Sequence, residues 1–274
     1  MPSHAQRDRF LQALNDGPLV MGILNVTPDS FSDGGRHNQL DQAVRHAQQM
    51  IADGADLLDI GGESTRPGAA MVEADEELAR VLPVLEALQN CPVPISIDTY
   101  KASVARAAIG AGACIVNDVW GLQKDPAMAD VIAETGAAAV LMHNKSELEP
   151  DCDILSQINE FFDKSLALAE RAGIPAAHIL LDPGIGFGKS YEQNLTCINA
   201  IPQLRARGYS VLLGLSRKRM FAQMLGAELD ERLYGTLAAN LAGYAKGASV
   251  FRVHDVQPHK EALKTLTVLE NWDA

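Results

Sequence analysis

The sequence predicts a single-domain (β/α)8 barrel, an α/β architecture also called the TIM barrel. Two observations carry this prediction. Apolar, strand-like runs alternate with segments of helical periodicity about eight times along the chain, which is the order expected of a parallel barrel. These runs also stop on a polar or ionisable residue followed by a turn-rich loop. A core strand has no reason of its own to end repeatedly in this way.

The predicted strands end on side chains that are capable of chemistry. The residues at or just after the ends of the apolar runs are Asn25, Asp59, Asp98, Asn117, His143, Asp182, Ser216 and Arg252. In a parallel barrel the C-terminal ends of the strands share one face, where active sites lie. We therefore expect these side chains to converge on one mouth.

The helices are predicted from apolar residues that recur at intervals of three and four. The predicted helical segments are residues 40–52, 73–88, 101–109, 126–134, 154–172, 191–207, 232–246 and 258–272. Glycine follows several of them, as at Gly110, Gly136 and Gly173, where a helix commonly ends. Residues 1–17 are expected to form a short N-terminal cap segment, and residues 18–274 the barrel.

A doubly wound open sheet is the alternative architecture, since the number of strands alone does not show that a sheet closes. The chain of 274 residues is long enough for two small domains or one large barrel. No Ser/Gly-rich linker, charge block or low-complexity region divides it. We therefore predict one domain.

Composition narrows the functional classes. With 47% hydrophobic and 21% charged residues the chain is typical of a soluble globular protein. No apolar stretch approaches the roughly 18–20 residues of a membrane helix, and the first residues lack the apolar core of a signal peptide. We expect a cytoplasmic protein with no membrane partner. The four cysteines are scattered, which favours buried or incidental thiols over a zinc or redox site.

The formal net charge of −12 argues against a nucleic-acid partner and against long-range attraction of an anionic substrate. An anion can still bind if the rim of the mouth is basic, because local charge outweighs bulk charge at contact distance. The candidate cations in the loop regions are Arg66, Lys189, Arg217, Lys218, Arg252 and His254.

Two loops carry the most specific patterns. Residues 25–35 read NVTPDSFSDGG, a loop that is long for a βα connection and suits either a lid or an ordinary turn-rich surface. Asn25 and Asp33 in it offer the hard oxygen ligands that Mg²⁺ prefers. Residues 59–68 read DIGGESTRPG, where Arg66 beside hydroxyl residues suits an anion clamp or a solvated surface arginine.

Together these loops resemble the two signature loops of the dihydropteroate synthases. Further matches follow in family order, and the resemblance covers nearly the whole chain, residues 18–270. They are IDT at 97–99, ND at 117–118, LDPGIGFGK at 181–189, SRK at 216–218 and RVHDV at 252–256. The resemblance implies a transferase that joins 6-hydroxymethyl-7,8-dihydropterin diphosphate to 4-aminobenzoate, giving 7,8-dihydropteroate and pyrophosphate in folate biosynthesis.

The resemblance also implies where each substrate lies. A pterin has a donor and acceptor edge on a flat ring, which suits carboxylates and amides at strand ends. The expected pterin site is Asp98, Asn117, Met142, Asp182, Phe187, Gly214 and Lys218. The expected 4-aminobenzoate site is Phe31, Thr65, Pro67, Phe187, Ser216 and Lys218. The expected diphosphate site is Asn25, Thr65, Arg66, Arg252 and His254.

Asp98, Lys218 and Arg66 are the candidate catalytic residues. The expected chemistry is loss of diphosphate to give a resonance-stabilised pterin cation, followed by attack of the amine. Mg²⁺ is the expected cofactor, with Asn25 as its ligand and Asp33 as a second candidate. Asp59 and His143 are interpreted as supporting or structural residues, and Asp182 before Pro183 also fits a turn former.

The resemblance has departures and leaves alternatives open. Many family members have a longer loop where this chain has residues 142–151. No residue is inserted within residues 186–189, unlike in drug-resistant relatives, so sulfonamides are expected to compete with 4-aminobenzoate. A methyltetrahydrofolate:corrinoid methyltransferase-like barrel should lack both signature loops. A non-catalytic pterin-binding paralogue would be expected to lose Asn25, Arg66 or the pair Arg252 and His254. A homodimer is also implied, through apolar outer faces of helices in the last third.

Overall fold

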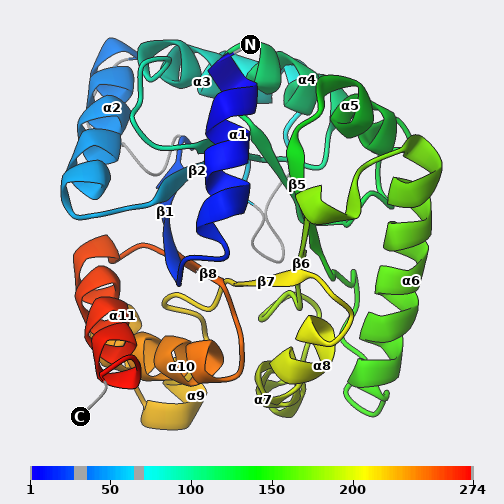
Figure 1. The fold of residues 1–274 in the computed structure, drawn as a ribbon, viewed down its shortest axis with the longest axis vertical. Coiled ribbons are helices and arrows are strands. Elements are labelled where there is room, and N and C mark those ends of the chain that lie inside the picture. Colours follow the sequence, from blue (N-terminus) through cyan, green and yellow to red (C-terminus); the bar gives the residue numbers. More distant parts are fainter. Residues whose placement is uncertain (1, 28–35, 65–70, 273–274) are drawn as a thin grey trace.

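A computed structural model of the chain is a closed barrel of parallel strands (Figure 1). The structure describes residues 2–27, 36–64 and 71–272. Each strand pairs with the next along the chain, and β8 (Val250–Val253) closes on β1 (Leu19–Asn25). The strands between them are β2 (Leu57–Gly61), β3 (Ile95–Asp98), β4 (Ile115–Asp118), β5 (Ala138–Met142), β6 (Ile179–Asp182) and β7 (Ser210–Leu213). This closure confirms the predicted (β/α)8 barrel and excludes the open sheet.

Helices surround the barrel, and one of them covers its N-terminal end. The surrounding helices are α2 (Arg36–Ala52), α3 (Ala74–Ala87), α4 (Ala102–Gly110), α5 (Met128–Thr135), α6 (Ile154–Ala172), α7 (Tyr191–Asn199), α8 (Ile201–Arg205), α9 (Met220–Leu225), α10 (Leu233–Ala245) and α11 (Val256–Glu270). The first segment, expected only as a cap, is the helix α1 (Pro2–Ala13), which lies across the strands in Figure 1. Its Phe10 packs into the barrel interior against residues of the strands.

Apart from shifts of a few residues at their ends, the helices differ from the predicted segments at three places. The segment predicted as one helix over residues 191–207 is divided into α7 and α8, because Pro202 has no N–H to continue the helical hydrogen bonds. The six-residue α9 was not predicted, since it is too short for a periodic pattern. Gly110 lies inside α4 rather than after it. Gly136 and Gly173 do end their helices, with φ of 66° and 85°.

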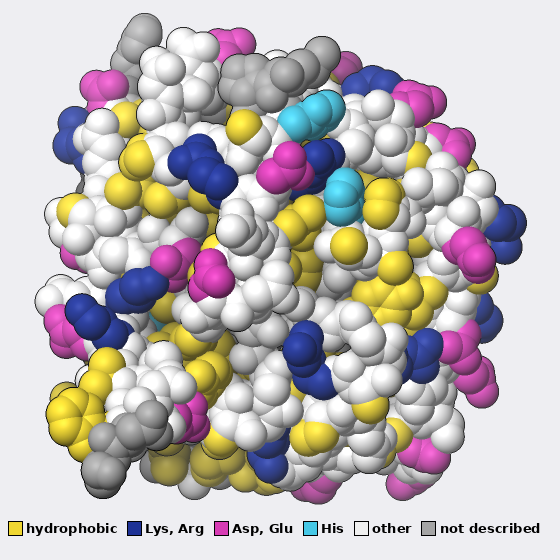
Figure 2. All heavy atoms as spheres, viewed as in Figure 1, with side chains coloured by type: hydrophobic (Ala, Val, Ile, Leu, Met, Phe, Trp, Pro, Cys, Tyr) yellow, Lys and Arg dark blue, Asp and Glu magenta, His cyan; other side chains and the backbone are white. Residues whose placement is uncertain are grey.

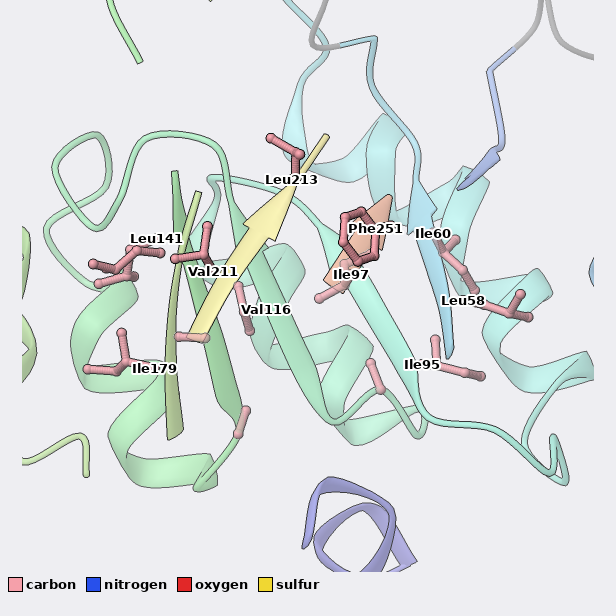
Figure 3. Packing of buried hydrophobic residues seen from close by; sticks show 14 of the residues in the cluster. Leu58, Ile60, Ile95, Ile97, Val116, Leu141, Ile179, Val211, Leu213 and Phe251 are labelled. Atoms are coloured by element: carbon pink, nitrogen blue, oxygen red, sulfur yellow. The ribbon is translucent and has the colours of Figure 1, made fainter. Parts of the chain in front are cut away.

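Alternate residues of each strand pack outward against the helices. Figure 3 shows Leu58 and Ile60 from β2, Ile95 and Ile97 from β3, and Phe251 from β8 in this outer core. Side chains alternate along a strand, so the residues between them point into the barrel. The outer core therefore determines which residues are left to face the axis.

The inward positions form an apolar lower part and a polar upper part. Met21, Leu57 and Ile115 pack together with Phe10 in the interior near the N-terminal end. Two residues further along these strands, and at the corresponding level of the other strands, the inward positions are polar. They are Asp59, Asp98, Asn117, Asp182 and Arg252. The strand period of two thus places the predicted polar ends at one face of the barrel.

The outer surface carries both signs of charge. Figure 2 shows Lys and Arg side chains interspersed with Asp and Glu over the face seen in Figure 1. In the described part of the chain, no helix combines the length and apolarity required to cross a membrane.

Candidate active site

Residues at or next to the ends of four neighbouring strands form one row at the mouth. Asn25 pairs with Gly61, Gly61 with Asp98, and Asp98 with Asn117. Gly61 leaves room in this row: a Cβ there would lie 3.4 Å from Asp98 Cβ and 3.8 Å from Asn25 Oδ1. The predicted Mg²⁺ ligand and two predicted pterin ligands therefore adjoin one another.

Arg252 lies at the centre of the polar layer. Its Nε donates to Asp59 Oδ2 at 2.6 Å, and its Nη2 donates to Asp98 Oδ2 at 2.7 Å. Asn117 Nδ2 donates to the same oxygen of Asp59 at 3.1 Å. Burial alone lowers the pKa of Arg252, but Asp59 and Asp98 raise it above its ordinary value, so the guanidinium stays charged. Arg252, assigned from sequence to the diphosphate, thus lies among the groups assigned to the pterin, and Asp59 is its buried counter-ion.

Three acceptor atoms in this layer have no hydrogen-bond donor among the described residues. They are Asp59 Oδ1 and, at or next to the ends of the next two strands, the buried pair Asp98 Oδ1 and Asn117 Oδ1. A buried acceptor without a donor is costly, so this pair is suited to the N–H groups of a ligand. Burial raises the pKa of Asp98 to about 7, against the opposing effect of Arg252.

Asp182 and Lys218 form the opposite side of the layer. Asp182 Oδ1 accepts from Gly184 N at 2.7 Å, and burial raises the pKa of its carboxyl. Lys218 Nζ donates to Ile185 O and lies 4.6 Å from the centre of the Phe187 ring. Burial lowers the pKa of Lys218 to about 7, opposed by Asp182. This side of the layer therefore presents a carboxylate, an ammonium and an aromatic face to a ligand.

Two small or apolar residues complete this surface. Met142 pairs with Asp182 across β5 and β6, so it adjoins the carboxylate. At Gly214 a Cβ would lie 3.7 Å from Asp182 Oδ2 and 3.8 Å from Arg252 Cβ. The described residues that were predicted to bind the pterin thus surround one part of the polar layer, which forms the floor of the mouth.

Ser216 and His254 are in direct contact at the far side of the mouth. Ser216 Oγ accepts from His254 N at 3.2 Å and lies 3.0 Å from His254 Nδ1. Arg217 beside them has a left-handed φ of 54°, and its guanidinium pairs with Asp255. Of the cations expected at the rim, Lys189 is buried, Arg252 is partly buried in the polar layer with 19% of its side chain exposed, and Arg217 is paired with Asp255.

Several predicted site residues cannot be placed. Phe31, Asp33, Thr65, Arg66 and Pro67 lie outside the described residues.

An ionic cluster that the sequence did not reveal borders the second signature loop. Lys101 Nζ bonds to both Glu63 and Glu77, whose side chains are buried. Glu63 Oε1 also accepts from Tyr100 OH at 3.1 Å and from Val72 N at 3.3 Å. Burial alone lowers the pKa of Lys101, but its bonds to the two carboxylates raise it. The cluster ties the residues on either side of the loop to α3 and α4.

Lys101→Met is expected to lower the free energy of unfolding by about 3–5 kcal/mol, because Glu63 and Glu77 remain buried without their cation. Urea unfolding followed by circular dichroism measures this. Arg106→Met on the same helix removes an exposed ion pair with Glu134 and is the control, expected to cost less than about 1 kcal/mol. Equal urea midpoints for the Lys101 variant and the unmodified protein would contradict the role of the cluster.

Comparison with known proteins assigns the family. Residues 21–254 match the model of the family described as pterin binding enzyme. The dihydropteroate synthase of Bacillus subtilis is 49% identical over 254 residues, which span 92% of this chain and 89% of that protein.

Solved structures agree in fold and sequence. The Clostridium difficile dihydropteroate synthase in the presence of pteroic acid has a TM-score of 0.90 and 47% identity, covering 93% of this chain and 98% of that one. The Xanthomonas albilineans enzyme with 4-aminobenzoic acid has a TM-score of 0.90 and 44% identity, covering 94% and 95%. The Yersinia pestis enzyme with a sulfonamide drug complex has a TM-score of 0.87 and 43% identity, covering 94% and 96%. With its barrel, its buried polar floor and these relatives, the chain belongs to the pterin binding enzymes and, among them, to the dihydropteroate synthases.

Proposed function

We propose that the chain condenses 6-hydroxymethyl-7,8-dihydropterin diphosphate with 4-aminobenzoate to give 7,8-dihydropteroate and pyrophosphate in folate biosynthesis. The observation that carries this is the pair of unpartnered acceptors, Asp98 Oδ1 and Asn117 Oδ1, on the same floor as Asp182 and Lys218. Membership of the dihydropteroate synthases supports the same reaction.

The floor suits a pterin ring in both polarity and shape. Asp98, Asn117 and Asp182 offer acceptor oxygens for the ring N–H groups, and the Lys218 ammonium offers a donor. Hydrogen bonds to charged groups are short and orienting, and burial strengthens them. Phe187, with Met142, offers apolar contact for a ring face.

The bond changes follow from the electronics of the substrate. The C–O bond to the diphosphate breaks with its electron pair leaving on oxygen, and the positive charge left on the carbon is delocalised over the pterin ring. The amine nitrogen of 4-aminobenzoate then forms the C–N bond and loses a proton to solvent or to diphosphate. A buried carboxylate such as Asp98, when ionised, stabilises the cation. His254 and Arg66 are proposed to bind the departing anion.

Mg²⁺ is the proposed cofactor, and Asn25 fits it as one hard-oxygen ligand at the end of β1. Bound there, the ion would neutralise charge on the diphosphate. The second candidate ligand, Asp33, is not placed by the structure.

Pyrophosphate release, measured with and without 4-aminobenzoate, tests the proposed reaction. Release that requires 4-aminobenzoate and matches dihydropteroate formation one for one supports it. A methyltransferase or a non-catalytic paralogue would give no such coupled release. The absence of coupled release would therefore overturn the proposal.

Sulfonamides are expected to raise the apparent KM for 4-aminobenzoate without lowering kcat. They carry an aniline like that of 4-aminobenzoate, and the chain has no insertion within residues 186–189. Initial rates over a grid of the two concentrations measure this. Inhibition that excess 4-aminobenzoate fails to relieve would contradict a shared site.

The pH profile of kcat/KM for the pterin diphosphate is expected to be bell-shaped, with both limbs near neutrality. The carboxylate form of Asp98 and the ammonium form of Lys218 are the ones that bind the ring, and the pKa of each is about 7. The rate therefore rises as Asp98 loses its proton and falls as Lys218 loses its own. Lys218→Arg should abolish the alkaline limb, and a flat profile between pH 5 and 9 would be inconsistent with this assignment.

A second copy of the chain is the proposed partner, bound through the outer faces of α9, α10 and α11. Large apolar side chains are exposed on these helices and on the short turn between α9 and α10: Leu225, Leu229, Tyr234, Val268 and Leu269. Large apolar side chains exposed on neighbouring elements suit an interface. Sedimentation velocity should give the dimer mass for the unmodified chain and the monomer mass for Tyr234→Asp, and a monomeric unmodified chain would disprove the partner.

A further inference from the structure

Lys189 is a buried cation with no carboxylate partner among the described residues. The residue is only 9% exposed. None of the ion pairs among the described residues includes it. A buried charge is costly unless it is paired or hydrogen-bonded, so other groups must satisfy the Lys189 ammonium.

Neutral acceptors satisfy the ammonium. Lys189 Nζ lies 2.8 Å from His143 Nδ1, 2.8 Å from Gly184 O and 3.1 Å from Phe187 O. His143 O is a fourth, longer contact at 3.4 Å, so the three N–H donors of the ammonium all find acceptors. Burial, followed by Lys189 and Lys145, lowers the pKa of His143 to about 2, so its ring is neutral and Nδ1 accepts.

These acceptors belong to two loops that are closely packed against each other. Gly184 and Gly188 lie in the turn after β6, and both have left-handed φ. A Cβ at Gly184 would lie 1.9 Å from His143 O, and one at Gly188 would lie 2.6 Å from Lys145 O. The turn therefore rests directly on the backbone that follows β5, and Lys189 bonds to both sides of this contact.

The same turn presents the aromatic and carbonyl groups that surround Lys218. Phe187 lies in it, with its ring under the Lys218 ammonium, and Ile185 O accepts from that ammonium. At Gly186 a Cβ would lie 3.1 Å from Lys218 Cδ. A shift of the turn would thus move the groups that face both substrates.

We propose that Lys189 is a positioning residue, whose ammonium joins the turn at residues 184–187 to His143 and so fixes Phe187 and Lys218 relative to the floor. His143 then serves as an acceptor for Lys189 and not as an acid or base. The inference rests on the proposed function, because Phe187 and Lys218 are its substrate-facing groups.

Lys189→Met tests the proposal, because methionine keeps an apolar stem of similar length and removes every donor. The matched control is Lys145→Met, which removes a neighbouring ammonium bonded to Glu149 and Gln157 but to no acceptor of the turn. Steady-state kinetics are run with purified full-length protein at a temperature where circular dichroism shows each variant fully folded. We expect the KM for 4-aminobenzoate to rise about tenfold or more in Lys189→Met, and to stay within about twofold in the control.

A second variant keeps the test decisive if Lys189→Met folds poorly, and a double-mutant cycle extends it if both variants fold. His143→Leu removes one acceptor and keeps an apolar side chain against Phe161, whose ring centre lies 4.9 Å from that of His143. His143→Leu should also raise the KM for 4-aminobenzoate, but by less than Lys189→Met does. Adding it to Lys189→Met should have no further effect. Unchanged KM and kcat in the folded Lys189 or His143 variant, or an equal effect of Lys145→Met, would overturn the positioning role. An unmodified chain that makes no dihydropteroate would instead refute the proposed function.

Discussion

Asp182→Asn is expected to lower kcat/KM for the pterin diphosphate by about a thousandfold, since it replaces a charged acceptor with an amide that also presents donors. The side chains are isosteric, and the amide oxygen can still accept from Gly184 N, so the fold should be preserved. Initial rates of pyrophosphate release at low pterin concentration measure the loss. The effect should appear in the Kd of the pterin substrate, determined without 4-aminobenzoate, as well as in turnover.

Asp118→Asn is the matched control for this prediction. Asp118 is also a buried carboxylate at the end of a strand, and burial raises its pKa to about 6. Its oxygens accept from Trp120 N at 2.8 Å and Leu122 N at 2.7 Å, so it holds a loop rather than facing the axis. Comparable losses of kcat/KM in the two variants would show that burial, and not contact with the pterin, explains the Asp182 effect.

Arg252→Met is expected to lower the free energy of unfolding at pH 8 by about 3–5 kcal/mol and to abolish measurable turnover, because Asp59 and Asp98 stay buried beside each other without a cation. The folded-state pKa of Asp98 is already raised, and loss of Arg252 raises it further. A raised carboxyl pKa gives stability that is full below the unfolded pKa and is lost as pH rises through the folded pKa. The variant should therefore be closer to the unmodified protein at pH 5 than at pH 8.

Urea unfolding at the two pH values measures the stability change. Adding Asp59→Asn to Arg252→Met removes one of the two stranded charges and should restore part of the lost stability at pH 8. The ion-pair argument fails if the single variant matches the unmodified protein at both pH values, or if the second substitution destabilises it further.

The barrel and the position of its site were predictable because they depend on local rules. Asp98, Asn117 and Asp182 each follow an apolar run, and period two along parallel strands brings such ends to one face. The two loops that supply the family resemblance are contiguous in sequence, so no knowledge of tertiary contacts was required to recognise them.

The partners of the buried charges were not predictable in the same way. Arg252 is 193 residues from Asp59 and 154 from Asp98, and closure of β8 on β1 is what brings them together. The same holds for Lys101, which finds Glu63 and Glu77 on different elements. A lone cation in a loop is read from sequence as solvated, and only the packed structure shows which ones, such as Lys189, are interior.

The apolar lower part of the barrel has a kinetic consequence. Phe10 from α1 and the side chains of Met21, Leu57 and Ile115 fill the axis below the polar floor and are almost wholly shielded from solvent. The described residues therefore fill the axis below the floor, so a ligand of the floor enters and leaves from the side of the C-terminal strand ends. A molecule lying on the floor must go in before anything stacked above it and leaves after it, so the depth of each subsite, and not its affinity alone, fixes the sequence of binding and release.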